Sequence, residues 1–444
     1  MDVISLFAGC GGFDLGFRRA GFNIIWANEY DQSIHKTYLY NHPQTILNTS
    51  DITSLKISDI PDCDGIIGGP PCQAWSLGGK CLGLNDPRGR LIYDYIRIVK
   101  GKRPKFFIME NVAGLVSPKH IKTFNSFLDL FRKAGYKIKF KIINAADFMI
   151  PQDRLRVFIV GIRNDIDVEY FFPVSKGQKP IKLIHAIGDI KTPPRPYGTE
   201  KIIQTEEYKL NHDYYTGPFD QKFMARNRIR SWNEQSFTIQ AQAKNTPLHP
   251  QAPKMIYISA TERKFVPGHE KEYRRLSVRE CARIQSFPDY FYFVYSDIRD
   301  GYKMVGNAVP PRLAYILANS IKECFTNNYH NILVGYVKNM KDLNIIREHN
   351  IYYVRKGVRA GSMQYDQLDK GIKKLYLHND NMRWAFELKD EKVQPCDKDY
   401  LKKLGFTPHG NEYWVFHINK EIDDIEYLTN IVNNHELSKA PFVI

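Results

Sequence analysis

Residues 3 to 12 read VISLFAGCGG, and this stretch decides the expected fold of the chain. Val3 to Phe7 is apolar and predicts a buried strand, and Ala8 to Gly12 predicts a tight turn. The residues that follow place Phe13 and Phe17 on one face of a helix. A strand, a glycine loop and a helix in this order open a nucleotide-binding βαβ unit, which predicts an α/β protein with a Rossmann-like sheet.

The glycine loop departs from the dinucleotide fingerprint, because Asp14 stands where the third glycine belongs. The loop also has no Lys or Arg for a phosphate, which favours S-adenosylmethionine over NAD or ATP. A turn needed only for strand–helix packing is the alternative. The next expected strand ends at Glu29, where a carboxylate would meet ribose hydroxyls. Asp51 is either an acceptor for an adenine amino group or a turn or N-cap residue.

A second stretch, GGPPCQAWS at residues 68 to 76, carries the candidate nucleophile. The apolar run before it predicts a buried strand that stops at Gly68, because Pro70 and Pro71 prevent further pairing. Cys72 would then lie at the carboxyl end of a strand, where open α/β sheets hold their active sites. Its thiol is read as a nucleophile, and a packing cysteine is the alternative.

Two further groups follow buried strands. Glu110 is expected at the tip of the strand 106–109, where partial desolvation would raise its pKa and suit it to hold a proton; an N-cap or surface acid is the alternative. Arg154 and Arg156, two residues apart beside the strand 157–162, would point to one face. One or both could reach a polar substrate, although arginines on the surface are the default interpretation.

Bulk properties limit the function classes. The chain has 444 residues and a net charge of +15, which suggests a polyanionic partner. Residues 331–444 hold 17 Lys and Arg against 16 Asp and Glu, so the basic surface should lie in the first three quarters. Seven cysteines without metal-ligand spacing predict no metal and a reducing compartment. The expected location is the cytoplasm, with no membrane association.

Six ordered motifs now resemble one family, the cytosine carbon-5 DNA methyltransferases of bacterial restriction-modification systems. They are FAGCGG at 7–12, GGPPCQ at 68–73, ENV at 110–112, QDRLR at 152–156, RECARIQSFPD at 279–289 and GNAVP at 306–310. The resemblance covers most of residues 1–325. It implies the class I S-adenosylmethionine-dependent methyltransferase fold with an inserted target-recognition domain.

The resemblance also implies a role for each matching residue. Cys72 would attack carbon 6 of a cytosine, Glu110 would protonate ring N3, and Arg156, with Arg154 behind it, would support that contact. Carbon 5 would then be nucleophilic enough to take the methyl group. The cofactor S-adenosyl-L-methionine would contact Phe7, Gly9, Cys10, Gly11, Gly12, Glu29, Tyr30, Asp51, Ile52, Leu91, Asn307 and Val309.

Methylation of a stacked base requires that the cytosine be flipped out of the duplex. Residues 77–89 are proposed to close over the DNA, and Ser76 is assigned to DNA contact. The family places target recognition at about 175–275, where Arg226, Arg228 and Arg230 alternate along an expected strand and Gln240 follows. Arg reads guanine, Gln reads adenine, and basic residues can track phosphates; a solvated strand face is the alternative.

The segment 224–253 looks like that of the GGCC-modifying HaeIII-type enzymes, which makes a GGCC-like site the expected target. The expected domains are a catalytic domain (1–175), a target-recognition domain (176–295), a return segment that completes the catalytic domain (296–330), and a small α+β accessory domain (331–444). The protein should act on double-stranded DNA as a monomer, with a possible protein partner for the accessory domain. An RNA cytosine methyltransferase and a non-catalytic DNA-binding protein are the alternative functions.

Overall fold

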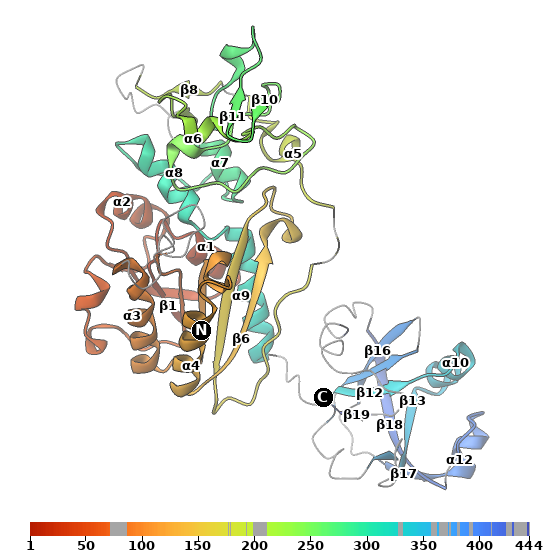
Figure 1. Ribbon diagram of the computed structural model, residues 1–444. Coiled ribbons are helices and arrows are strands. Elements are labelled where there is room, and N and C mark those ends of the chain that lie inside the picture. Colours follow the sequence, from red (N-terminus) through yellow and green to blue (C-terminus); the bar gives the residue numbers. More distant parts are fainter. Residues whose placement is uncertain are drawn as a thin grey trace. The chain divides into compact units, whose positions relative to one another are not determined.

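The computed structural model divides the chain into two compact units, Met1–Lys322 and Glu323–Ile444. Figure 1 shows the helices and strands of both units. The structure describes residues 1–71, 87–175, 177, 179–191, 193–198, 211–326, 332–356, 362–363, 372, 374–379, 382–389, 394–409, 411–422, 429 and 442–443. Cys72 and Ser76 lie outside the described residues, as does most of the 77–89 segment.

A seven-stranded sheet forms the centre of the first unit, in the order β3-β2-β1-β4-β5-β7-β6. Strands β1 to β5 are parallel to one another, whereas β7 runs antiparallel to both β5 and β6. The strands are β1 (Asp2–Leu6), β2 (Asn23–Asn28), β3 (Ile46–Asn48), β4 (Gly65–Gly68), β5 (Phe106–Val112), β6 (Tyr136–Asn144) and β7 (Leu155–Arg163). This order confirms the expected Rossmann-like sheet.

Helices cover both faces of this sheet. Consecutive residues of a strand point to opposite faces, and in β5 they are buried on both. Phe107 packs against Phe131 on one face, in a core cluster that takes in α3 and α4. Phe106 points the other way and contacts Phe22, which contacts Phe17 of α1. The helices around the sheet are α1 (Gly12–Arg19), α2 (Gln32–Asn41), α3 (Pro87–Lys102), α4 (Ile121–Lys133), α8 (Ile298–Asn307) and α9 (Pro311–Thr326).

The last of these helices returns to the first, as the expected discontinuous catalytic domain requires. A side chain on Gly16 of α1 would come within 2.3 Å of Ala314 Cβ and 2.6 Å of Pro311 O, so α1 and α9 pack at backbone contact. Short 3₁₀ turns connect several elements: Ile52–Ser54, Ile57–Asp59, Ala113–Val116, Ala145–Phe148, Ala243–Asn245 and Glu270–Glu272.

The segment between β7 and α8 has little regular structure and lies at one end of the unit, coloured green in Figure 1. It has its own small core around Phe223, Ile229, Leu248 and Tyr273. Its elements are α5 (Leu183–Ile187), β8 (Arg195–Pro196), β9 (Asp213–Tyr214), α6 (Gln221–Met224), β10 (Ile256–Ser259), β11 (Glu262–Lys264) and α7 (Val278–Ile284).

The second unit is a mixed sheet with helices, which agrees with the expected α+β class. Its strands lie in the order β14-β13-β18-β16-β15-β12-β19, and β17 also pairs with β18. The elements are β12 (Ile332–Tyr336), α10 (Met340–His349), β13 (Ile351–Lys356), β14 (Ser362–Met363), β15 (Lys374–His378), β16 (Arg383–Leu388), β17 (Gln394–Asp397), α12 (Lys398–Lys403), β18 (Glu412–Glu421) and β19 (Phe442–Val443).

Candidate active site and nucleic-acid interface

The carboxyl ends of β4 and β5 bring the two central motifs together. The last pair of the two strands is Gly68 with Met109, so Glu110 is the first residue of β5 beyond β4. The Asn111 side-chain amide donates to Pro70 O at 3.1 Å, and a side chain on Gly69 would lie 3.1 Å from Glu110 Oε2. The described backbone that leads to residue 72 is therefore held directly beside the Glu110 carboxyl group.

Glu110 lies inside β5 and is only 7% exposed, which rules out the N-cap and surface-acid alternatives. Its Oε1 lies 3.0 Å from Arg156 Nε in an ion pair that is shielded from solvent. Burial raises the pKa of Glu110, and the positive charges of Arg156 and Arg154 offset part of that rise. A carboxyl group in this setting can hold a proton and release it to a bound base.

The two arginines of the QDRLR motif have different tasks. Arg156 contacts Glu110, whereas Arg154 is 1% exposed and donates to three backbone carbonyls, those of Ile239, Gly306 and Ala308, each at 3.0 Å. The default interpretation of surface arginines was therefore wrong. Arg154 thereby joins β7 to the segment between β7 and α8, here called the recognition segment, and to the return segment. It contributes to the site by holding these backbones in place.

The glycine loop after β1 adopts the backbone that its residues suggest. Gly9 and Gly11 have φ values of +57° and +86°, and Phe7 also has a positive φ of +54°. A side chain on Gly9 would meet no atom within 4 Å, so one side of this turn is open. Cys10 does not face that space: its thiol is buried and lies 3.5 Å from Met304 O.

Glu29 lies against this loop. Its Oε2 accepts the Gly9 backbone N–H and its Oε1 accepts the Asp31 backbone N–H, both at 2.8 Å. Burial raises the pKa of Glu29. A half-buried carboxylate beside an open glycine turn can also accept hydroxyl groups, because each oxygen has a second lone pair. The acceptor oxygens of Glu29 therefore fit the ribose hydroxyls of S-adenosyl-L-methionine.

The remaining expected cofactor residues differ in how far they are exposed. Asp51 is exposed and caps the turn after it by accepting the Thr53 backbone N–H at 2.9 Å, which is the N-cap alternative. That cap leaves its second carboxylate oxygen available. Tyr30 is 67% exposed. The others are Ile52, which is buried, Leu91, which is half-buried, Asn307, which is exposed, and Val309, whose carbonyl would lie 2.7 Å from a side chain on Gly12.

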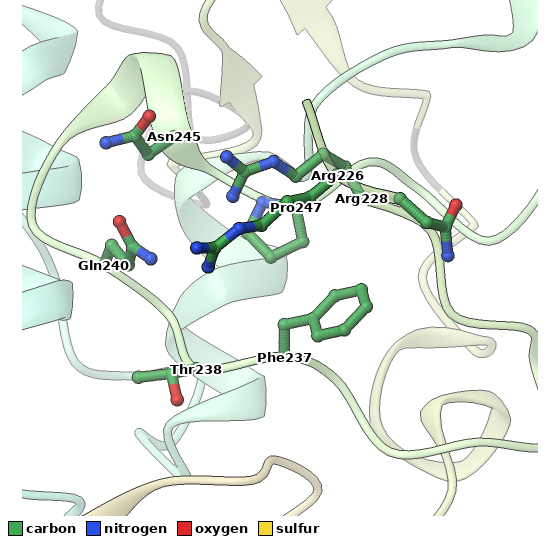
Figure 2. A pocket seen from close by; sticks show the side chains of 8 residues that line it. Arg226, Arg228, Phe237, Thr238, Gln240, Asn245 and Pro247 are labelled. Atoms are coloured by element: carbon green, nitrogen blue, oxygen red, sulfur yellow. The ribbon is translucent and has the colours of Figure 1, made fainter. Parts of the chain in front are cut away.

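A pocket of about 220 Å³ lies in the recognition segment. Figure 2 shows the guanidinium groups of Arg226 and Arg228 pointing to the side of this pocket where Gln240 and Asn245 lie. Arg228 is fixed by hydrogen bonds to Phe223 O (3.1 Å) and Lys222 O (3.3 Å). The lining is completed by Asn227, Phe237, Thr238 and Pro247.

The expected strand through the three alternating arginines is absent from this described segment, where Ile229 makes only an isolated bridge with Leu248. Arg226 is exposed, and its guanidinium has no hydrogen bond or ion pair with any described residue. Arg230 instead pairs with Asp153 at 3.3 Å and Glu234 at 3.2 Å. Two arginines are thus directed to the pocket and the third is neutralised by carboxylates.

The sequence analysis did not identify two residues that hold the segments around the glycine loop, Asp14 and Lys303. Asp14 was noted only as a departure from a fingerprint, yet it is fully buried and accepts hydrogen bonds from Ser5 Oγ and Tyr38 OH, both at 2.6 Å. Burial raises its pKa to about 6. An acidic residue in an apolar helix face was the available signal. Lys303 gave none, because Asp31 and Ser33, which it contacts, are about 270 residues away along the chain.

Two absences concern only the part of the chain that the structure describes. No three His, Cys, Asp or Glu side chains there converge as metal ligands would. No helix there is both long enough and apolar enough to cross a membrane.

Comparison with known proteins decides the family. The family model of the C-5 cytosine-specific DNA methylases matches residues 1–323. The chain belongs to this family. The match ends within one residue of the boundary between the two compact units, so the family model covers the first unit and not the second.

Relatives among known methyltransferases agree. The Type II methyltransferase M.FnuDI of Fusobacterium nucleatum is 48% identical over 330 residues, which cover 74% of this chain and 96% of the relative. M.MthTI of Methanothermobacter thermautotrophicus is 49% identical over 324 residues (73% and 97%), and M.NgoPII of Neisseria gonorrhoeae is 46% identical over 327 residues (73% and 96%).

A solved structure shares the fold. A prophage-encoded DNA modification methyltransferase from E. coli has a TM-score of 0.57 at 24% identity, covering 74% of this chain and all of that one. The protein is a DNA (cytosine-5-)-methyltransferase of the Type II restriction-modification class, and its methyl donor is S-adenosyl-L-methionine.

Proposed function

We propose that this methyltransferase acts through a covalent bond between Cys72 and its target cytosine. The observation that carries the proposal is the buried Glu110–Arg156 pair, 3.0 Å apart, beside the backbone that leads to Cys72. The Cys72 thiolate adds to carbon 6 while Glu110 gives its proton to N3. Carbon 5 thereby gains the electron density to form a bond to a methyl group.

Besides the cofactor, which leaves as S-adenosyl-L-homocysteine once its methyl group is transferred, the cycle needs only a base for the carbon-5 proton. Bound S-adenosyl-L-methionine supplies an electrophilic methyl group. After methylation, carbon 5 loses its proton to a base, the carbon 6–sulfur bond breaks to return the thiolate, and the N3 proton returns to Glu110. The target cytosine must be flipped out of the duplex for its ring to reach Glu110, since that carboxyl group is buried.

A Cys72→Ser variant tests the nucleophile. It should bind duplex DNA and cofactor with unchanged affinity and transfer no methyl group in a labelled-methyl assay. Cys396→Ser, in the second unit, is the matched control and should be fully active. Turnover by Cys72→Ser would show that another group attacks the ring.

For the cofactor we propose that Glu29 binds the ribose hydroxyls and that the Gly9–Gly12 loop and Phe7 border the ligand. The free carboxylate oxygen of Asp51 would face the adenine amino group, with Ile52 and Leu91 beside the ring. Tyr30, Cys10, Asn307 and Val309 complete the proposed set. The open side of Gly9 and the position of Glu29 against that loop support this assignment.

For the DNA we propose that Arg226 and Arg228 read guanine edges from the pocket shown in Figure 2, with Gln240 beside them. Arg is suited to the O6 and N7 acceptors of guanine, and two arginines in one pocket suit a target with adjacent guanines, such as GGCC. Arg230 would act indirectly, since its charge is already paired with Asp153 and Glu234. Ser76 is proposed to contact the DNA near the flipped base.

Methylation-sensitive sequencing of DNA from cells that express the chain tests the target. Methylation confined to GGCC-like sites supports the proposal, and methylation at sites without adjacent guanines contradicts it. Arg226→Ala and Arg228→Ala should each weaken discrimination at one position by about 1–3 kcal/mol. Arg230→Ala should leave the sequence preference unchanged.

The biological role that fits these properties is protection of host DNA from a cognate restriction enzyme, in the cytoplasm and as a monomer on DNA. We propose a protein partner for the second unit. Its charge is nearly balanced, which suits a protein contact better than a phosphate backbone. Pull-down with the full chain and with residues 1–326 would identify contacts that require this unit.

A further inference from the structure

Lys303 joins two segments of the catalytic unit that are far apart in the sequence. It lies on α8, and its Nζ donates to Asp31 Oδ2 and to Ser33 Oγ, both at 2.7 Å. Asp300 Oδ1, one turn earlier on α8, lies 2.8 Å away. An ammonium group has three N–H donors, so these three oxygens use its whole capacity.

Asp31 has a defined task at the other end of this contact. Its carboxylate caps α2 by accepting the Ser33 backbone N–H at 3.1 Å and the Ser33 hydroxyl at 2.7 Å. Its own backbone N–H donates to Glu29 Oε1 at 2.8 Å. Lys303 therefore holds the residue that holds Glu29, and it does so from outside the cofactor contacts.

The same helix also borders the glycine loop. Met304 O accepts from the Cys10 thiol at 3.5 Å, and the chain after α8 passes within contact of Gly12 at Val309. The ion pair is partly exposed, with side-chain exposures of 30% for Lys303 and 38% for Asp31, so solvent screens it. Its importance lies in orientation rather than in stability, because a single nitrogen fixes three oxygens from two elements.

We propose that Lys303 is a positioning residue for S-adenosyl-L-methionine, which it affects by fixing Asp31 and through it the Glu29 carboxylate. The proposal rests on the assignment of Glu29 to the ribose hydroxyls. Loss of Lys303 would let the turn between β2 and α2 relax, so that Glu29 would no longer be set against Gly9. The affected quantity is cofactor affinity, and the rate at saturating cofactor should change little.

The test is the equilibrium dissociation constant of S-adenosyl-L-methionine, measured by calorimetry on the full chain without DNA. Lys303→Met should raise this constant about tenfold, a free-energy change of about 1.4 kcal/mol. Asp31→Asn should have a similar effect, and the double variant should be no worse than either single variant, because both changes break the same contact. Lys303→Arg keeps the charge but cannot place one nitrogen among three acceptors. Its affinity for S-adenosyl-L-methionine should therefore lie below that of the wild type.

Lys105→Met is the matched control. Lys105 pairs with Asp64 at 2.8 Å in the same unit, at the amino ends of the strands and far along the sheet from Glu29. This variant should bind the cofactor as the wild type does, at a comparable thermal midpoint. An equal loss of affinity in Lys105→Met would mean that general destabilisation explains the effect, and the proposal would fall.

Glu29→Gln separates this inference from the assignment on which it rests. Weak binding by Glu29→Gln together with unchanged binding by Lys303→Met would overturn the role of Lys303 and leave the ribose assignment standing. Unchanged binding by Glu29→Gln would overturn the ribose assignment itself. Additive losses in the Lys303→Met, Asp31→Asn double variant would show that Lys303 does not act through Asp31.

Discussion

Replacing Glu110 by Gln separates the proton transfer expected of this side chain from its packing. The amide has nearly the same shape, so it can still fill the space beside Gly69 and accept a hydrogen bond from Arg156, 3.0 Å from the carboxylate in the wild type. It can donate to cytosine N3 but cannot release a proton to it. The expected loss is therefore that of general acid catalysis, about 10²–10⁴-fold in the rate of methyl transfer.

Stability should respond much less than rate. The ion pair is buried, with side-chain exposures of 15% for Arg156 and 10% for Glu110. In the variant the Arg156 guanidinium donates to a neutral amide oxygen and no longer to a charged carboxylate. A loss of about 1–2 kcal/mol in the free energy of unfolding is expected, since hydrogen bonds to charged groups exceed neutral ones by roughly this amount. Cofactor affinity should stay within about twofold, a change of less than ~0.5 kcal/mol.

The assay is single-turnover transfer of a labelled methyl group to a duplex, with calorimetric cofactor affinity and thermal unfolding measured on the same samples. Glu169→Gln is the control, because Glu169 also pairs with a basic residue of this sheet, Lys139 at 2.7 Å, but lies outside the proposed site. The control should transfer methyl at the wild-type rate. A Glu110→Gln rate within tenfold of wild type, with folding intact, would refute the acid role.

The direction of the pH dependence follows from the same burial. Because burial raises the pKa of Glu110, the protonated acid persists to higher pH than it would in solution, and the transfer rate should fall as pH rises through that raised pKa. Glu110→Gln should lose this descending limb.

Three other substitutions test the surrounding structure. Burial raises the pKa of Asp14 to about 6, so its contribution to stability is present at low pH and lost as pH rises. Relative to Asp14→Asn, the wild type should lose about 2 kcal/mol in the free energy of unfolding by urea between pH 4 and 6. Glu280→Gln should lower the free energy of unfolding by roughly 3 kcal/mol, because both terminal nitrogens of Arg274 donate to the Glu280 carboxylate, which is 3% exposed. Gly306→Ala should impair DNA binding, since its methyl group would lie 2.3 Å from the backbone nitrogen of Ala241 and would displace the recognition segment. Unchanged stability or DNA binding in any of these three variants would contradict the packing described.

Much of the fold was predictable because the parallel strands are buried on both faces and so appear as uniformly apolar runs. The runs that became β1, β4 and β5 were identified with their ends within a few residues. The edge strand β6 is less buried than the alternating apolar residues of its sequence suggest. Phe140 and Ile142 are instead 44% and 45% exposed, because an edge strand has a neighbour on one side only.

The positions of site residues were predictable where the local sequence determines them. They were not predictable where contacts with distant segments determine them. Glu110 was placed correctly toward the carboxyl end of a buried strand, and its burial follows from the apolar residues before it. The arginine segment was misread as a strand, because its alternation is local whereas Arg228 and Arg230 are held by particular carbonyls and carboxylates. Long-range contacts such as those of Arg154 and Lys303 leave no periodic signal in the sequence.

The central claim is a transient bond between the Cys72 sulfur and carbon 6 of a flipped cytosine. It is tested most directly with a duplex that the enzyme methylates, in which the target base is replaced by 5-fluorocytosine. Fluorine cannot leave as the proton does, so the account predicts that protein, methyl group and DNA remain joined one to one on a denaturing gel, with mass spectrometry locating the bond at Cys72. Methylation of the ordinary duplex with no trapped complex on the fluorinated one, or a bond at another residue, would contradict the account.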